Sequence, residues 1–260
     1  MNMENKGNLC KKALILASGG VDSTVCVAIA VDKLGAENVS TVSVKYGQKH
    51  SKELECAAKV ADFYHTGHYE LDLSNIFKYS NCSLLKGSMD TIPEMSYAEQ
   101  IEQNGKPSTE VPLRNGLMLM GIGSLAMQIH PEDNVEIYIG AHADDAAGDA
   151  YPDCSEEFIR NINEAILIGS RNKVQIISPF VNCNKSEVVR VGLSLGAPFE
   201  LTTSCYNGRN KACGLCGTCR DRIAAFKANN AVDPVEYEID DPFKEMRGCS
   251  NENVATCSTK

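Results

Sequence analysis

The stretch Ala13-Leu14-Ile15-Leu16-Ala17-Ser18-Gly19-Gly20-Val21-Asp22-Ser23-Thr24-Val25-Cys26-Val27 decides the fold. Its first five residues form an apolar run that predicts a buried strand, and the apolar sequence after Asp22 predicts a helix. Only small residues separate the two, so we expect a tight turn that leads directly from the strand into the helix. A strand followed by such a turn and a helix is the unit from which α/β domains are built.

The rest of the chain repeats this alternation. Apolar runs rich in Val and Ile predict further strands at residues 39–44, 68–73, 135–141 and 174–177. Amphipathic stretches predict helices at 22–34, 51–64, 115–129, 155–168 and 185–195, with Gly35 and Gly196 standing where C-terminal caps are expected. The pattern predicts an α/β fold with a doubly wound parallel sheet covered by helices on both faces.

Two stretches interrupt the alternation. Residues 75–112 are polar and loop-like, and residues 204–220 are rich in cysteine. Long connections inside a compact α/β domain are usually functional. We expect a nucleotide-binding α/β domain at 1–203, a metal knuckle with a C-terminal helix packed on it at 204–235, and a partly flexible tail at 236–260 that frays toward Lys260.

The composition favours a small-molecule substrate over a nucleic acid. The 260 residues are 43% hydrophobic, enough for one sizeable core, and the net charge is −9, whereas nucleic-acid binders usually present a clustered basic face. No apolar run of ~18 residues is present, and residues 1–7 lack the apolar stretch of a signal peptide, so we expect a cytoplasmic protein without a membrane partner. The 12 cysteines are then reduced thiols plus a metal site.

The turn Ser18-Gly19-Gly20-Val21-Asp22-Ser23 has the properties of a phosphate-binding loop. Unpaired N–H groups and the positive end of the dipole at a helix start bind anions, glycines let the backbone approach them, and the two serines add hydroxyl donors. Asp22 would repel a phosphate, but a carboxylate suits the Mg²⁺ that accompanies a nucleotide. The chain has no Gly-Lys-Ser/Thr, and no Gly-x-Gly-x-x-Gly follows this strand, which excludes the Walker A and dinucleotide-binding loops.

Closely spaced thiols mark a metal site at Cys205, Cys213, Cys216 and Cys219. Four thiolates close a tetrahedral Zn²⁺ site with no open position for water, so we expect one structural zinc. An iron–sulfur cluster is the alternative, because Cys-x-x-Cys-x-x-Cys also occurs in ferredoxin-like proteins. No spacing links a further set, which we expect to be unligated: Cys10, Cys26, Cys56, Cys82, Cys249 and Cys257.

The loop and the cysteine cluster, with several other segments, resemble the 7-cyano-7-deazaguanine synthase family of the PP-loop ATP pyrophosphatases. Residues 18–23 resemble the Ser-Gly-Gly-x-Asp-Ser loop of that superfamily, and the resemblance runs from about Lys12 to Tyr237. The further segments that carry it, in order and spacing, are Lys45-Tyr46-Gly47-Gln48-Lys49-His50, Val111-Pro112-Leu113-Arg114-Asn115, Gly140-Ala141-His142-Ala143-Asp144-Asp145, Tyr151-Pro152-Asp153-Cys154, Asn184-Lys185-Ser186-Glu187 and Ser204-Cys205-Tyr206.

The resemblance implies a Rossmann-like fold of the adenine nucleotide alpha-hydrolase type and an ATP-dependent carbon–nitrogen ligase. Its implied reaction converts 7-carboxy-7-deazaguanine and ammonia to 7-cyano-7-deazaguanine in queuosine biosynthesis, with ATP, Mg²⁺ and one Zn²⁺. The sequence departs from the family pattern at four positions near the implied substrate pocket. In the family pattern Gly usually stands where this chain has Leu113, Asn where it has His142, Arg where it has Ser155 and Trp where it has Thr203.

The resemblance also implies site residues. Asp22 is the candidate Mg²⁺ ligand, and Arg114 and Lys185 are candidates for stabilising phosphates or the substrate carboxylate. His50 and His142 are candidate proton shuttles. The candidate substrate residues are Asp144, Asp145, Tyr151 and Asp153. The candidate ATP-binding residues are Ala17, Ser18, Gly19, Gly20, Val21, Asp22, Ser23, Thr24, Val25, Cys26, Val27, Tyr46, Gly47 and Gln48.

Two other functions are compatible with the phosphate loop. The first is that of a PP-loop enzyme that adenylates a tRNA base or a different carboxylate or amide. The net negative charge of the chain argues against binding of tRNA. A sensor that holds ATP without turnover is the second, and it would form no AMP. We expect small-molecule substrates, no nucleic-acid partner and a homodimer.

Overall fold

The computed structural model describes residues 11–247. Predictions that fall on residues 1–10 and 248–260 lie outside the described residues, among them the fraying toward Lys260 and the unligated state of Cys10, Cys249 and Cys257. Within 11–247 no helix is both long and apolar enough to cross a membrane.

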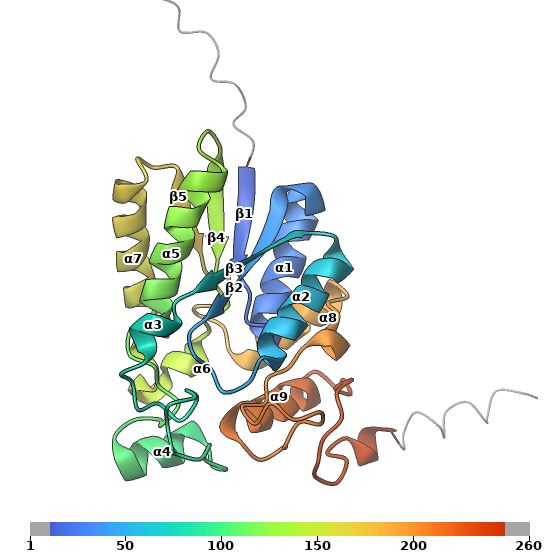
Figure 1. Cartoon of the computed structure of the whole chain (residues 1–260). Coiled ribbons are helices and arrows are strands. Elements are labelled where there is room, and N and C mark those ends of the chain that lie inside the picture. The colour runs from blue at the N-terminus through green and yellow to red at the C-terminus, as the bar shows by residue number, and fades with distance from the viewer. Residues whose placement is uncertain (1–10, 248–260) are drawn as a thin grey trace, which may run out of the picture.

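A five-stranded parallel sheet forms the centre of the molecule (Figure 1). Its strands are β1 (Lys11–Leu16), β2 (Val39–Lys45), β3 (Gly67–Asp72), β4 (Asn134–Tyr138) and β5 (Val174–Ile177). They lie in the order β3-β2-β1-β4-β5, and every neighbouring pair is parallel. Because this order reverses direction beside β1, it is that of a doubly wound dinucleotide-type fold, and the predicted fold class is confirmed.

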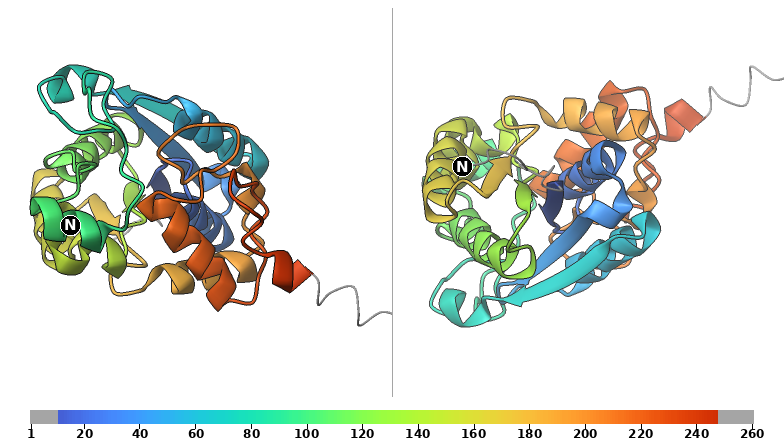
Figure 2. Two further views of the ribbon diagram at one scale, coloured as in Figure 1. Left: turned by 90° about the horizontal axis from the view of Figure 1, so that it is seen from below. Right: turned by 90° about the horizontal axis from the view of Figure 1, so that it is seen from above.

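Helices cover both faces of the sheet (Figure 2). One face packs against α1 (Val21–Leu34), α2 (Lys52–Tyr64) and α8 (Lys185–Ser194), and the other against α5 (Arg114–Ile129) and α7 (Glu156–Gly169). α9 (Gly217–Ala228) packs against α8. Side chains of a strand alternate between the two faces. In β1, Ala13 and Ile15 therefore join the first core, while Leu14 joins the second.

The stretch 75–112, which the sequence predicts as a loop, contains regular structure. It begins inside α3 (Ser74–Phe77) and includes α4 (Tyr97–Asn104). Ser96 and Glu99 form a capping box at the start of α4, which stabilises a helix too short and polar to show an apolar period. The remaining short elements are α6 (Ala143–Ala146) and the 3₁₀ turns Ala36–Asn38, Ala147–Asp149, Pro152–Cys154 and Phe199–Leu201.

β4 is shorter than the predicted strand at 135–141. Its pairing with both β1 and β5 ends at Tyr138, so the residues that follow leave the sheet. They enter the region at the carboxyl ends of the strands, where α4, α6 and α9 also lie, at the bottom of Figure 1. In parallel α/β sheets this is the edge that binds ligands.

Candidate active site

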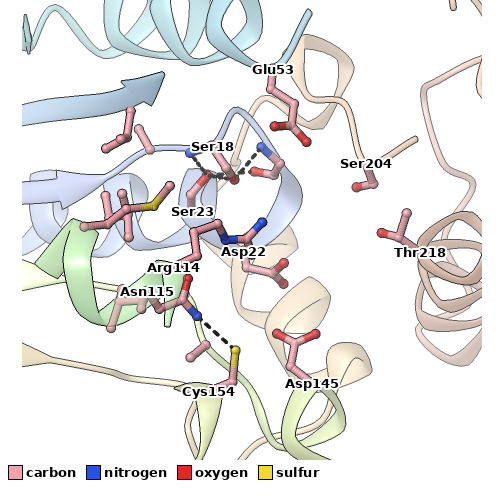
Figure 3. Close-up of a pocket in the computed structure, with 18 of the residues that line it drawn as sticks. Ser18, Asp22, Ser23, Glu53, Arg114, Asn115, Asp145, Cys154, Ser204 and Thr218 are labelled. Carbon is pink, nitrogen blue, oxygen red and sulfur yellow. Dashed lines mark hydrogen bonds between the residues drawn. The ribbon is translucent and has the colours of Figure 1, made fainter. Parts of the chain in front are cut away.

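A cavity of about 210 Å³ lies at the carboxyl ends of β1, β2 and β4. The loop after β1 contributes Ser18, Asp22 and Ser23 to its lining (Figure 3). The segment that follows β4 contributes Gly140, and the start of α8 contributes Lys185. The position between β1 and β4 is where the strand order reverses, so the crevice lies where this fold class binds its ligands.

The loop after β1 is shaped by Gly19. Its φ is +73°, and a Cβ there would lie 2.2 Å from the carbonyl oxygen of Glu53, so the close approach to α2 requires glycine. Ser18 Oγ accepts a hydrogen bond from the N–H of Gly20 at 3.3 Å and lies 3.2 Å from Ser23 Oγ. The first N–H groups of α1 have no helical partner, so they and the two hydroxyls offer donors to an anion.

Asp22, Lys185 and His142 form a cluster beside the loop. Lys185 Nζ donates to both carboxylate oxygens of Asp22, at 2.7 and 2.5 Å, and Lys185 is only 7% exposed. His142 Nε2 lies 3.5 Å from that nitrogen and 3.8 Å from Asp22 Oδ1. Burial opposes the charge of Asp22, but Lys185 and His142 outweigh it and lower the pKa of the carboxyl. The site thus holds an ionised aspartate against a buried ammonium.

Asp145 and Asp144, neighbours in sequence, have different positions. Asp145 lines the cavity with Oδ2 at 3.4 Å from His142 Nε2, and burial raises the pKa of its carboxyl. Asp144 Oδ2 instead accepts the N–H of Lys185 at 2.8 Å, which fixes the start of α8. Asp144 thereby positions the residue whose ammonium reaches Asp22.

The other two candidate substrate residues hold neighbouring elements in place. Asp153 Oδ2 accepts the N–H of Asn115 at 2.9 Å, at the start of α5. The buried hydroxyl of Tyr151 lies 2.6 Å from Thr109 Oγ1. Neither residue is part of the cavity lining.

Arg114 extends into the cavity from the first residue of α5 (Figure 3). Its guanidinium carbon lies 5.4 Å from the ring centroid of Tyr46, a cation–π contact that holds the planar group in one orientation. Leu113, at the N-cap, adopts φ +51° and turns the chain into the helix. A guanidinium held in this way suits bidentate binding of a phosphate or a carboxylate.

The candidate ATP-binding residues fall into two groups. Those that line the cavity are Ala17, Ser18, Gly20, Asp22, Ser23, Tyr46 and Gln48, whereas Gly19 and Gly47 are outside the lining. Beyond the first turn α1 is enclosed by the sheet and α8, so its side chains serve the core. The candidate ATP-binding residues of α1 that are buried are Val21, at its first position, and Thr24, Val25, Cys26 and Val27.

His50 lies outside the cavity lining. A Cβ on Gly208 would lie 2.2 Å from its ring carbon Cγ, so the imidazole packs against the backbone of the cysteine-rich segment. Of the two candidate proton shuttles, only His142 belongs to the charged cluster with Asp22 and Lys185.

Several lining residues were not selected from the sequence. Asn115, Cys154, Ser204 and Tyr206 lie in segments that resemble the family, so the resemblance contained a signal for them. Glu53 had none, because Lys52-Glu53-Leu54-Glu55 has the composition of a solvated helix face. Met118 and Thr218 also line the cavity and had no distinguishing pattern.

The four cysteines of the knuckle meet as predicted. The sulfurs of Cys205, Cys213, Cys216 and Cys219 all lie within 4.8 Å of one another, and all four residues are buried. Tetrahedral coordination at a Zn–S distance of ~2.3 Å places sulfurs about 3.8 Å apart, and Cys213 Sγ lies 3.9 Å from Cys219 Sγ. The N–H of Cys213 donates to Cys205 Sγ at 3.3 Å, a bond suited to a thiolate. The cluster therefore fits a metal ion.

The knuckle also forms a wall of the cavity. Ser204 and Tyr206 flank Cys205, and Thr218 precedes Cys219, and all three line the cavity (Figure 3 labels Ser204 and Thr218). The position of this wall consequently depends on the cysteine cluster.

A family model described as "Queuosine biosynthesis protein QueC" matches residues 12–230. The chain belongs to the QueC family. The 7-cyano-7-deazaguanine synthase of Pseudoalteromonas atlantica is 40% identical over 230 residues, covering 88% of this chain and all of the relative (100%). That of Caldicellulosiruptor saccharolyticus is 38% identical over 229 residues, covering 88% and 96%. The structure of NMN synthetase from Francisella tularensis aligns at a TM-score of 0.47 and 14% identity, covering 97% and 90%.

The four departures from the QueC pattern lie at two kinds of position. His142 is in the charged cluster, and Thr203 lines the cavity and donates its N–H to the carbonyl of Gly19 at 2.9 Å. Leu113 and Ser155 are the N-caps of α5 and α7, and the Ser155 hydroxyl accepts the N–H of Phe158. Two departures thus touch the site and two concern helix starts.

Proposed function

We propose that this chain is an ATP-dependent synthase that converts 7-carboxy-7-deazaguanine and ammonia to 7-cyano-7-deazaguanine. The observation that carries the proposal is that a phosphate-type loop, Lys185 and Arg114 line one cavity in a chain of the QueC family. The curated relatives named above bear the name of this enzyme.

The chemistry activates one carbon twice. A carboxylate oxygen attacks the α-phosphorus of ATP and releases pyrophosphate, which gives an acyl adenylate with AMP as a good leaving group. Ammonia displaces AMP and loses a proton, so the amide forms. The amide oxygen then attacks the α-phosphorus of a second ATP and releases pyrophosphate. AMP leaves with that oxygen while the nitrogen loses its two protons, which gives the carbon–nitrogen triple bond. These steps need positioning and charge neutralisation rather than a protein nucleophile.

Each group of cavity residues has its own role in this reaction. The loop from Ser18 to Ser23 binds the β and γ phosphates, and Tyr46 with Gln48 lines the adenine pocket. Arg114 and Lys185 neutralise charge on the α-phosphate or the substrate carboxylate. Asp22, with Asp145 nearby, would hold the Mg²⁺ that accompanies ATP, because carboxylates are its preferred protein ligands.

We further propose one Zn²⁺ in the knuckle, with a structural role. Buried thiolates in tetrahedral spacing support this, and four sulfur ligands leave no position for water or substrate. Thiolate ligands persist where thiols stay reduced, so we place the protein in the cytoplasm. The homodimer stays a prediction from the sequence.

The test is the identity of the product. Purified protein with ATP, Mg²⁺, ammonium and 7-carboxy-7-deazaguanine should give the nitrile by mass spectrometry, and Asp22→Ala should give none while remaining folded. Asp32→Ala, which changes an exposed acid on the same helix, is the matched control and should behave as the unaltered protein. Absence of the nitrile, or a fully active Asp22→Ala protein, would refute the assignment.

A further inference from the structure

Glu53 is the acidic residue of the cavity lining whose carboxylate is left without a hydrogen bond or ion pair among residues 11–247. The acidic residues of the lining are Asp22, Glu53 and Asp145. Asp22 is bonded by Lys185, and Asp145 lies 3.4 Å from a nitrogen of His142. Within the described part of the chain, no hydrogen bond or ion pair is found for the carboxylate of Glu53. It extends from α2 into the cavity from the side opposite Asp145 (Figure 3).

The backbone of Glu53 is held firmly although its side chain has no partner. Gly19 packs directly on its carbonyl oxygen, in the first turn of α2. Burial raises the pKa of Glu53, and Arg114 only partly offsets the effect, so the charged form is unfavourable where it stands. A desolvated carboxylate on a fixed stretch of backbone, with Arg114 nearby but without a hydrogen bond or ion pair of its own, is a group that a ligand completes.

The chemistry of the cavity limits what that ligand group is. A carboxylate offers two acceptor oxygens side by side and repels phosphate, so it suits a ligand edge with two parallel N–H donors. A 2-aminopyrimidinone ring has that edge, formed by its ring N1–H and its exocyclic amino group. The guanidinium of Arg114 supplies the opposite charge in the same cavity, for a ligand that also carries a carboxylate.

We propose that Glu53 binds the 2-aminopyrimidinone edge of the substrate, accepting hydrogen bonds from N1–H and the 2-amino group, while Arg114 meets the carboxylate. This inference rests on the proposed function and assigns the orientation of the substrate within that site. Glu53 and Arg114 select the substrate jointly: the acid rejects ligands that present acceptors at this edge, and the cation favours a negative group at the reacting end. Glu53 is thus a specificity residue that touches the substrate.

The experiment is a binding cycle with the full chain, measured by calorimetry. The ligands are 7-carboxy-7-deazaguanine, its analogue without the 2-amino group, and a non-hydrolysable ATP analogue with Mg²⁺. The variants are Glu53→Gln and, as a matched control, Glu55→Gln, which alters an exposed acid on the same turn of α2. Glutamine keeps the shape of the side chain but turns one acceptor into a donor that faces a donor.

Glu53→Gln should weaken binding of the acid about 100-fold, since two bonds to a charged group are disturbed. The same substitution should weaken binding of the analogue without the amino group by less than about 10-fold. The difference between the two losses of affinity measures the coupling between Glu53 and the 2-amino group, which a purely structural role of Glu53 would not produce. The ATP analogue should bind Glu53→Gln as it binds the unaltered protein, and Glu55→Gln should change nothing. Equal losses of affinity for 7-carboxy-7-deazaguanine and for its analogue without the 2-amino group would overturn the proposal. Weakened binding of the ATP analogue would indicate a contact with the ribose or Mg²⁺ and would overturn it as well.

A stability measurement shows that the variant is folded. Because the folded-state pKa of Glu53 is raised, its charge opposes folding above that pKa, and this cost disappears as the pH falls below the unfolded value. Glu53→Gln should therefore melt higher than the unaltered protein at pH 8, and the gap should close on acidification. A lower melting temperature at pH 8 would contradict the account of an unpartnered acid.

The outcomes separate this inference from the proposed function. If the unaltered protein binds no 7-carboxy-7-deazaguanine, the proposed function fails, and the same variants are compared on guanine and hypoxanthine. A preference for guanine that Glu53→Gln removes would keep the edge assignment for another 2-aminopyrimidinone substrate. No such preference would overturn it together with the function.

Discussion

Asp22 and Lys185 form an ion pair in the structure, and both residues are also proposed to act on ATP. The side chain of Lys185 is 9% exposed and that of Asp22 is 23% exposed, so the pair is largely shielded from solvent. Removing one partner leaves the other charge without compensation in a poorly solvated place. The pair therefore links the stability of the chain to the chemistry of the site.

Lys185→Met should lower the free energy of unfolding by about 3 kcal/mol, because Asp22 loses the ammonium that offsets its burial. It should also slow both half-reactions by about 100-fold if Lys185 neutralises charge on the transferring phosphoryl group. Denaturant unfolding and single-turnover rates with the acid and the amide check this. Lys173→Met removes a more exposed lysine and should leave both quantities close to those of the unaltered protein. An unchanged unfolding free energy for Lys185→Met would contradict the role of the pair.

At the level of the element, α5 depends on an unusual turn. Leu113 adopts φ +51° at its N-cap, a region that costs a non-glycine residue energy, and its side chain is 68% exposed, so little burial offsets the cost. Glycine, the residue that the resemblance to the family implies at this position, adopts the same angle without strain. This departure thus concerns how α5 begins, just before the residue that carries the guanidinium.

Leu113→Gly should stabilise the protein by about 1 kcal/mol, since the left-handed turn becomes unstrained. Thermal and denaturant unfolding measure the change. Leu113→Ala is the control, because it removes the same side-chain contacts but keeps a Cβ in the left-handed region, and it should give no gain. Equal effects of the two substitutions would show that backbone strain is not the cause.

The knuckle is the second element with a testable role. Freshly purified protein should contain about one zinc per chain, and Cys216→Ser should lose it and melt more than about 10 °C lower. Because Ser204, Tyr206 and Thr218 of the cavity wall lie beside the cysteines, substrate binding should weaken as well. Cys183→Ser, outside the cluster and the cavity lining, should retain the metal. Iron with inorganic sulfide, or no metal in the unaltered protein, would refute the zinc assignment.

The success of sequence-based prediction differed between elements for physical reasons. The buried strand at 174–177 was predicted with its observed bounds, and the helix at 22–34 to within one residue, because burial imposes a local apolar pattern. α4 was missed because it is short and mostly polar, although Ile101 packs against the core and the capping-box pattern Ser96-x-x-Glu99 is a signal in the sequence. In the site, Asp22 stands in a local motif, whereas Glu53 reaches the cavity only because Gly19 lets α2 approach the loop, a contact between segments that no local pattern contains.

At the scale of the whole molecule, the sheet brings together residues that are far apart in sequence. Asp22 follows β1, Tyr46 follows β2, and Lys185 begins α8 after β5, yet all three line one cavity. The parallel arrangement produces this result, because the carboxyl ends of all the strands meet at one edge. The knuckle closes the same edge. One cavity therefore combines the loop after β1, the two cations and the carboxylate of Glu53.

The central claim is that this single site activates the same carbon twice, and the number of AMP molecules formed per nitrile tests it most directly. Quantifying both products from purified protein should give two AMP per nitrile from 7-carboxy-7-deazaguanine with ammonia. From synthetic 7-amido-7-deazaguanine without ammonia it should give one, because only the amide oxygen remains to be activated. Accumulation of the amide without the nitrile, or equal AMP yields from the two substrates, would contradict the account.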